Sequence, residues 1–164
     1  MNTFYSKEII KHFKNPYNIG EMKGYSGLGK VGNPICGDVL WLYIKVGKDK
    51  SGKEIIKQAS FSTFGCTVAI ANSSLITTLV NEKTLEEAMK ISKGDLLKKL
   101  KKVPPIKVHC SFLAIDALSE AIYDYLSKNK RKIPVDLQEK HKRIEKEKKE
   151  MEKRYKKMNE IGFV

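Results

Sequence analysis

Several residue types and patterns are scarce in this chain of 164 residues. Only three cysteines are present, so they cannot all pair within one chain, and a core of this size needs no disulfides. No apolar run approaches the roughly 18 residues of a membrane-spanning helix, so no membrane segment is expected. The N-terminal M-N-T-F-Y-S-K-E-I-I-K-H-F also lacks the apolar stretch of a secretory signal. We therefore expect a reducing, cytoplasmic protein in which cysteine serves chemistry or metal binding.

Acidic residues are few relative to lysine and arginine, which gives a formal net charge of +13. Residues 127–164 hold 14 Lys/Arg against 7 Asp/Glu, so much of the excess lies in the last quarter of the chain. No basic motif is interleaved with aromatic residues of the kind that stack on bases. We interpret the charge as a solvated face and do not expect nucleic-acid binding.

Strand patterns come first along the chain, and helical patterns follow. Residues 39–46 are apolar at nearly every position and 55–64 return after a Gly- and Asp-containing loop, which predicts an antiparallel hairpin. An irregular strand is expected near residues 25–31, and the adjacent prolines of 103–107 predict an extended segment there. Periodicity and capping patterns predict helices at 3–13 with Thr3 as N-cap, after Thr84, and at 67–80, 95–100 and 111–126. This order is typical of an α+β domain with helices packed on a small sheet.

A change of composition after Ser127 divides the chain into a domain at 1–127 and a charged, basic extension at 128–164. Within the extension, apolar residues recur at seven-residue spacing, with one more beside them: Leu137, Ile144, Met151, Met158 and the adjoining Tyr155. This is half of a coiled-coil stripe. We expect a long, solvent-exposed helical tail, and a partner-binding helix is the alternative.

The three cysteines each lie at a predicted break between elements. Cys36 occurs in N-P-I-C-G-D, Cys66 in F-G-C-T-V-A and Cys110 in K-V-H-C-S. Cys66 and Cys110 stand where helices begin, and the partial positive charge there favours thiolate by lowering the pKa of both thiols. Asp38, two residues after Cys36 in extended backbone, is expected to point to the same side and to offer an oxygen ligand. His109 offers a nitrogen ligand.

These residues predict one site assembled from distant parts of the chain, and they leave its metal open. Three thiolates with one oxygen or nitrogen ligand suit a tetrahedral zinc ion, or a 2Fe–2S cluster in which Asp38 or His109 replaces a fourth cysteine. The alternative is that the cysteines merely pack in the core; three thiols at element junctions, beside other ligand types, argue against it. His12 and His141, in charged surface settings, are expected to be inert.

Four segments that contain these residues resemble, in order, the iron–sulfur cluster assembly scaffold family, IscU and the N-terminal domain of NifU. They are H-F-K-N-P-Y-N-I-G (12–20), V-G-N-P-I-C-G-D (31–38), F-S-T-F-G-C-T-V-A-I-A-N-S-S (61–74) and V-P-P-I-K-V-H-C-S (103–111). The resemblance covers residues 1–127 and leaves the tail outside. It implies a three-stranded antiparallel sheet with helices over it. It also implies a non-enzymatic scaffold that assembles a 2Fe–2S cluster from iron and desulfurase-delivered sulfur and transfers it to acceptor proteins.

The resemblance further implies roles for individual residues. Cys36, Cys66 and Cys110 correspond to the cluster-binding thiols, with Cys110 as the persulfide acceptor. Asp38 corresponds to the residue associated with iron binding and cluster lability, and His109 to a candidate fourth ligand. The segment implied to bind a chaperone comprises Val103, Pro104, Pro105, Ile106 and Lys107.

The partners that the resemblance implies are a cysteine desulfurase, an Hsp70-type chaperone with its J-type co-chaperone, a frataxin-like regulator, a ferredoxin and apo iron–sulfur acceptor proteins. A homodimer is left open, as is zinc in the cluster-free form. The alternative function is a zinc-binding persulfide acceptor that relays sulfur from a desulfurase without building clusters. A thiol hydrolase is not expected, because Cys110 has no His or Asn motif around it other than His109.

Overall fold

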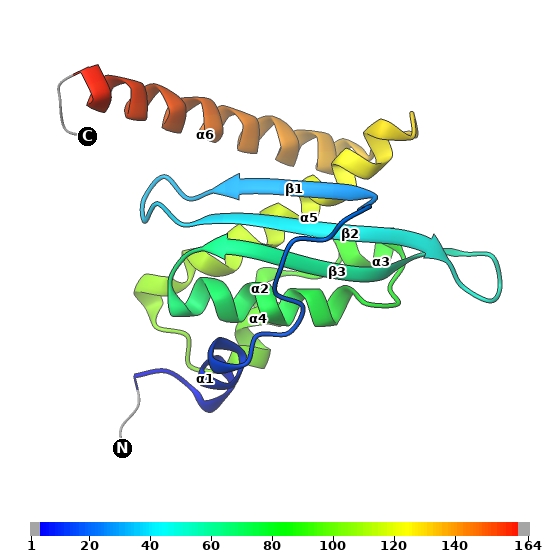
Figure 1. Ribbon diagram of the computed structural model, residues 1–164, viewed down its shortest axis with the longest axis horizontal. Coiled ribbons are helices and arrows are strands. Elements are labelled where there is room, and N and C mark those ends of the chain that lie inside the picture. The colour runs from blue at the N-terminus through cyan, green and yellow to red at the C-terminus, as the bar shows by residue number, and fades with distance from the viewer. Residues whose placement is uncertain (1–3, 161–164) are drawn as a thin grey trace.

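The computed structural model describes residues 4–160, and in it a three-stranded sheet carries helices on one face (Figure 1). The elements are α1 (Lys7–Lys14), β1 (Gly27–Gly32), β2 (Val39–Lys48), β3 (Glu54–Phe64), α2 (Thr67–Val80), α3 (Leu85–Met89), α4 (Lys93–Leu100), the 3-10 turn η1 (Pro105–Lys107), α5 (His109–Lys128) and α6 (Val135–Glu160). Within residues 4–160, no helix combines the length and apolar content needed to cross a bilayer.

The sheet has the order β1-β2-β3 and both pairings are antiparallel, which confirms the predicted hairpin and sheet. Alternate residues of β2 are buried beneath the helices, as Leu40, Leu42 and Ile44 show. The β2–β3 connection is closed by Asp49, whose carboxylate accepts the N–H of Lys53 at 2.9 Å. The α+β class predicted from the sequence is therefore correct.

Two glycines of β1 allow the strand to lie very close to α5. A Cβ atom added at Gly27 would lie 2.2 Å from the carbonyl oxygen of Ala121, and one added at Gly29 would lie 1.8 Å from that of Ala117. No larger residue fits at either position without moving the helix. This contact fixes α5 against the sheet, and the first turn of α5 carries Cys110.

Side chains cap the short helices at their first turns. Thr84 and Glu87 form the capping box at α3 that the sequence predicts. Ser6 caps α1 by accepting the N–H of Ile9 at 3.1 Å. The predicted cap, Thr3, lies outside the described residues, and α1 begins only at Lys7.

The two adjacent prolines do not keep the whole of 103–107 extended. Pro104 has extended backbone (φ −57°, ψ 136°), but η1 follows, and the N–H of Lys107 donates to the Pro104 carbonyl at 2.8 Å. The prediction of a wholly extended segment was wrong because a proline at the first position of a helical turn sacrifices no hydrogen bond. Helix α5 then begins at His109, two residues earlier than predicted.

The tail is helical, as predicted, but it is not solvent-exposed along its length. Leu137 and Ile144 are 2% and 4% exposed and belong to the main hydrophobic core. Figure 1 shows α6 running beside β1, and it also packs on α5. The half-stripe of apolar residues therefore covers this chain's own domain, because β1 and α5 leave apolar surface that α6 can bury. The predicted boundary between 127 and 128 stays a prediction.

The two histidines placed at the surface by sequence reasoning are buried, in the case of His12, or half-buried, in the case of His141. His12 is buried, with Nδ1 2.8 Å from the Ser74 hydroxyl. The ring of His141 stacks on Tyr123 with centroids 3.7 Å apart, and its Nδ1 lies 3.0 Å from a carboxylate oxygen of Glu120. Charged neighbours along the sequence are misleading here, because each histidine lies on the side of its helix that packs against another helix.

Candidate metal and cluster site

Two of the three thiols and one carboxylate meet where α2 and α5 begin. The ligand atoms of Asp38, Cys66 and Cys110 all lie within 4.8 Å of one another. The two sulfurs are 3.4 Å apart, and Cys110 Sγ lies 3.9 Å from Asp38 Oδ2. Two thiolates bound to one tetrahedral metal ion lie about 3.8 Å apart, so the pair already has nearly the spacing that a soft metal requires. The structure thus brings together three of the five predicted ligands.

Cys66 is the acidic member of this group. It is the N-cap residue of α2, and the backbone amides of Val68 and Ala69 lie where they stabilise a negative sulfur. The hydrogen bond from Cys110, aided by these amides, lowers the pKa of Cys66 to about 6. Cys66 is therefore mainly thiolate at neutral pH, which makes it both a nucleophile and a soft metal ligand.

Cys110 behaves in the opposite way. Its side chain is 1% exposed, and its hydrogen bond to Cys66, together with burial, raises the pKa of the Cys110 thiol. The prediction that both helix-start thiols are acidic was wrong for Cys110, because ionisation of the first of two adjacent thiols disfavours ionisation of the second. The pair therefore shares one proton, which must leave when both sulfurs bind a metal.

Cys36 lies beside this group and does not belong to it. Its side chain is exposed, and its sulfur is outside the set of atoms within 4.8 Å of one another. Partial burial raises the pKa of the Cys36 thiol, and the negative charges of Asp38 and Cys66 raise it further. The three thiols thus lie at one end of the domain, with two in contact and the third within electrostatic reach.

The loop that carries Cys36 is organised by Asn33, which the sequence analysis missed. Its side-chain oxygen accepts the N–H of Ile35 at 2.8 Å and that of Cys36 at 3.3 Å. The N–H of Gly37 donates to the Asn33 carbonyl at 2.9 Å, and Gly37 adopts a φ of +73°. The signal for this turn was an asparagine before proline with a glycine beyond, the residues that favour turns.

Asp38 is buried, with its carboxylate oriented toward the start of α2. Its Oδ2 accepts the N–H of Cys66 at 3.3 Å. The left-handed Gly37 breaks the extended backbone predicted between Cys36 and Asp38. Gly65 leaves room for the carboxylate, because a Cβ atom there would lie 3.3 Å from Asp38 Cγ. The sequence analysis missed Gly65, and its only signal was a glycine directly before a helix-start cysteine.

His109 is adjacent to Cys110 in the chain, but its ring is outside the group of close ligand atoms. Its Nε2 is buried and, among residues 4–160, has no hydrogen-bond partner. A buried polar atom left without a partner costs free energy. The nitrogen is therefore available to a ligand that comes within reach.

Apolar residues surround the site. Cys110 packs with Val68 and Ala69, and Val103 contacts the same cluster, which links the Pro-Pro segment to a thiol of the site. Large apolar side chains that lie within a few residues of a thiol in sequence are also exposed: Ile35, Phe64, Ile106 and Phe112. Sequence reasoning missed this exposure for all but Ile106, which it placed in a binding segment.

Comparison with known proteins shows which family the chain resembles. The model of the NifU-like N terminal domain matches residues 4–132. The iron sulfur cluster assembly protein 1 of Encephalitozoon cuniculi is 50% identical over 129 residues, which is 77% of this chain and 89% of that protein. The iron–sulfur cluster assembly scaffold protein IscU of Escherichia coli K12 is 46% identical over 131 residues, covering 78% of this chain and 98% of its own.

Solved structures agree at the level of the fold. The crystal structure of a nitrogen-fixing NifU-like protein (N-terminal) from Brucella abortus superimposes with a TM-score of 0.58 at 17% identity, over 75% of this chain and 94% of that one. A further crystal structure, of a hypothetical protein, gives a TM-score of 0.59 at 29% identity. This chain therefore belongs to the NifU-like N-terminal domain family and is a relative of the IscU scaffold proteins.

Proposed function

We propose that this protein is a non-enzymatic scaffold on which a 2Fe–2S cluster is assembled and from which it is transferred to acceptor proteins. The observation that carries the proposal is the contact between Cys66 and Cys110 beside the Asp38 carboxylate. The IscU scaffold relatives support the same function. Cys36 and either Asp38 or His109 would complete the ligand set. A set with one harder ligand holds a cluster less firmly than four thiolates, as transfer requires.

Sulfur would arrive from a cysteine desulfurase as a persulfide. An acceptor thiolate attacks the outer sulfur of the donor persulfide, a new S–S bond forms, and the donor cysteine leaves as a thiolate. Our candidate acceptor is Cys110. Because Cys110 carries the shared proton, that proton must first pass to Cys66 or to solvent. Reducing the transferred sulfur to sulfide takes two electrons, for which we propose a ferredoxin, one electron at a time.

The segment Val103–Lys107 is our candidate site for an Hsp70-type chaperone and its J-type co-chaperone. Ile106 is exposed and available for a first contact, whereas Pro104 is buried. Binding in an extended form would break the η1 hydrogen bond from Lys107 to Pro104. It would also pull on Val103, which packs against the cluster that Cys110 forms with Val68 and Ala69. Chaperone binding is thereby expected to disturb a cluster ligand.

The remaining partners are proposals of the same kind. The exposed Ile35, Phe64 and Phe112 offer an apolar docking surface for a desulfurase or an apo iron–sulfur acceptor protein. A frataxin-like regulator and a homodimer stay predictions. A reducing, cytoplasmic setting also stays a prediction, and it rests on the cysteine content.

The alternative function is a zinc-bound persulfide relay. The grouping of Asp38, Cys66 and Cys110 favours this alternative, because two thiolates and a carboxylate are also suitable zinc ligands. Reconstitution without oxygen distinguishes the two. The scaffold predicts visible charge-transfer absorption after addition of ferrous iron and sulfide, and loss of that absorption on transfer to an apo-ferredoxin. A colourless protein that retains one tightly bound zinc ion would contradict the scaffold and favour the relay.

A further inference from the structure

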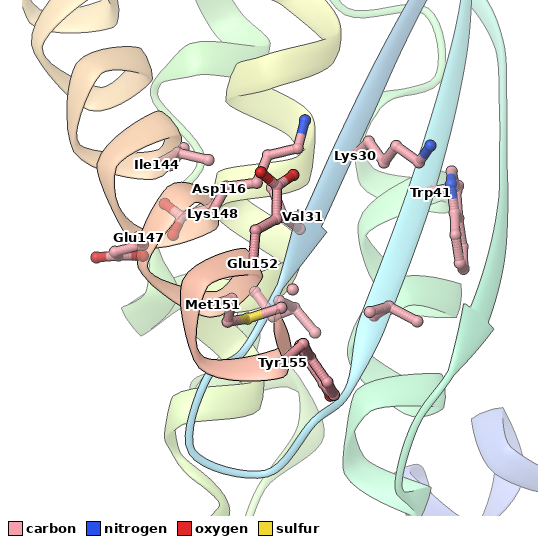
Figure 2. A pocket seen from close by; sticks show the side chains of 13 residues that line it. Lys30, Val31, Trp41, Asp116, Ile144, Glu147, Lys148, Met151, Glu152 and Tyr155 are labelled. Atoms are coloured by element: carbon pink, nitrogen blue, oxygen red, sulfur yellow. The ribbon is translucent and has the colours of Figure 1, made fainter. Parts of the chain in front are cut away.

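Helix α6 connects the core of the domain to the loop that carries Cys36. Its apolar residues become more exposed along the helix: Leu137 and Ile144 are buried, Met151 is half-buried and Met158 is 41% exposed. Figure 2 shows Ile144, Met151 and Tyr155 on the side of α6 that faces β1. A cavity of about 270 Å³ separates this part of α6 from the sheet. The helix is thus packed tightly at its beginning and loosely at its end.

Polar contacts reinforce the beginning of α6. His141 lies between Tyr123, on which it stacks, and the buried carboxylate of Glu120. Arg143 forms a bidentate interaction with Asp116, at 2.7 Å and 3.2 Å. These partners all lie on α5. The first half of α6 is therefore fixed to the helix that begins at the thiol pair.

The last turns of α6 lie against the Cys36 loop. A small cavity of about 160 Å³ is lined on one side by the loop and on the other by α6, through Asn33, Pro34, Gly37, Met151, Arg154, Tyr155 and Met158. A Cβ atom at Gly32, where β1 leads into the loop, would lie 2.9 Å from Met151 Cε. The helix thus contacts the strand before the loop, and across this cavity it faces Asn33, whose side chain organises the loop.

This helix lies beyond the region shared with the family. The family model ends at residue 132, and 98% of the Escherichia coli relative is matched within 78% of this chain. The thiol pair lies on α2 and α5, inside the shared region. The placement of α6 beside the loop is therefore an addition of this chain outside the region shared with the family.

We propose that α6 is a strap that restrains the Cys36 loop, with Met151, Tyr155 and Met158 as positioning residues. The proposal rests on the scaffold function, because the restrained thiol is a cluster ligand there. A ligand on an exposed loop is the one most able to leave a cluster, and restricting that loop keeps the thiol close to the metal. Movement of the loosely packed last turns of α6 frees the loop and exposes the cluster to an acceptor.

The test compares full-length chains by hydrogen–deuterium exchange without metal, and by the rate at which a reconstituted cluster is lost to a chelator. The Met151→Ala/Tyr155→Ala variant removes the contact from the helix side, and Gly32→Ala displaces Met151 from the strand side. The control for the double variant is Lys149→Ala/Glu150→Ala, which alters exposed α6 residues and keeps the net charge. The control for Gly32→Ala is Gly47→Ala, where an added Cβ would lie 2.9 Å from Lys57 Cγ.

In both test variants, amide exchange in residues 33–38 is expected to rise about three- to tenfold, with the starts of α2 and α5 unchanged. Cluster loss should quicken by a similar factor, and both controls should match the wild type. Unchanged exchange in 33–38 would overturn the strap. Faster exchange spread over the whole domain would also overturn it, because α6 would then serve stability alone. A wild-type protein that holds no cluster would refute the scaffold function. The amide-exchange comparison, made without metal, would still test whether α6 restrains the loop.

Discussion

The two sides of the thiol site are built on different supports. Cys66 and Cys110 begin α2 and α5, which pack in the core and fix their sulfurs 3.4 Å apart. Cys36 instead lies on a loop that is organised by the side chain of Asn33 and that lines a small cavity together with the last turns of α6. One side sets the acid–base properties of the site, and the other supplies an exposed thiol. This division suits a protein that must hold a cluster and later release it.

The largest expected effect concerns the fixed side. Cys110→Ser should abolish persulfide labelling by a cysteine desulfurase, because we assign the acceptor sulfur to Cys110. Mass spectrometry of the labelled chain would report it, with Cys36→Ser as the control that still accepts sulfur. Labelling that survives in Cys110→Ser and is lost only in Cys66→Ser would transfer the acceptor role to Cys66, whose pKa is the lowered one.

The second prediction separates the two sides by pH. The pKa of Cys66 is lowered to about 6, so its alkylation rate should rise as the pH passes 6 and then level off. Cys36 has a pKa raised above the ordinary 9.0, so its rate should still be rising at pH 9 in spite of its exposure. Cys66 should therefore ionise in a clearly lower pH range than Cys36. Site-resolved alkylation of the metal-free protein measures both, and parallel pH profiles would contradict the division.

The third prediction tests how α6 is anchored in the core. Leu137→Ala should lower the free energy of unfolding by about 2–5 kcal/mol, because it leaves a cavity where α6 enters the core. Met158→Ala, at the exposed end of the same stripe, should cost less than about 1 kcal/mol. Denaturant unfolding measures both. Equal, small losses would mean that α6 is not anchored as the structure shows.

The smallest expected effect concerns Asp38, which lies between the Cys66–Cys110 pair and the Cys36 loop. Asp38→Ala should lengthen the lifetime of a reconstituted cluster about tenfold, because it removes the harder and more exchangeable ligand. Transfer to an apo-ferredoxin, followed by absorption, measures it. Asp49→Ala, in the β2–β3 connection, is the control that should leave transfer unchanged. Transfer from Asp38→Ala at the wild-type rate would remove Asp38 from the ligand set.

The sequence was most informative where local chemistry decides the structure. The β2–β3 hairpin and the Thr84 capping box follow from alternation and from side-chain hydrogen bonds within a few residues, and both were predicted correctly. The helix-start position of Cys66 was also evident from the sequence, although its pKa is lowered mainly by the hydrogen bond from Cys110 and less by the amides of that helix start.

What the sequence missed depends on contacts between distant segments. The raised pKa of Cys110 arises from Cys66, 44 residues away, and no local pattern reports that distance. The burial of Leu137 and Ile144 depends on the surface that β1 and α5 present to α6. Gly65 and Asn33 matter because of where the Asp38 carboxylate and the Cys36 loop lie in space.

We propose that three thiols on these two supports bind one cluster. Anaerobic reconstitution of the wild type beside Cys36→Ser, Cys66→Ser and Cys110→Ser tests this binding, with iron, sulfide and visible absorption measured per chain. We predict a cluster of two irons and two sulfides in the wild type, and loss of its absorption in each variant. A Cys36→Ser protein that binds the cluster as well as the wild type would contradict the claim.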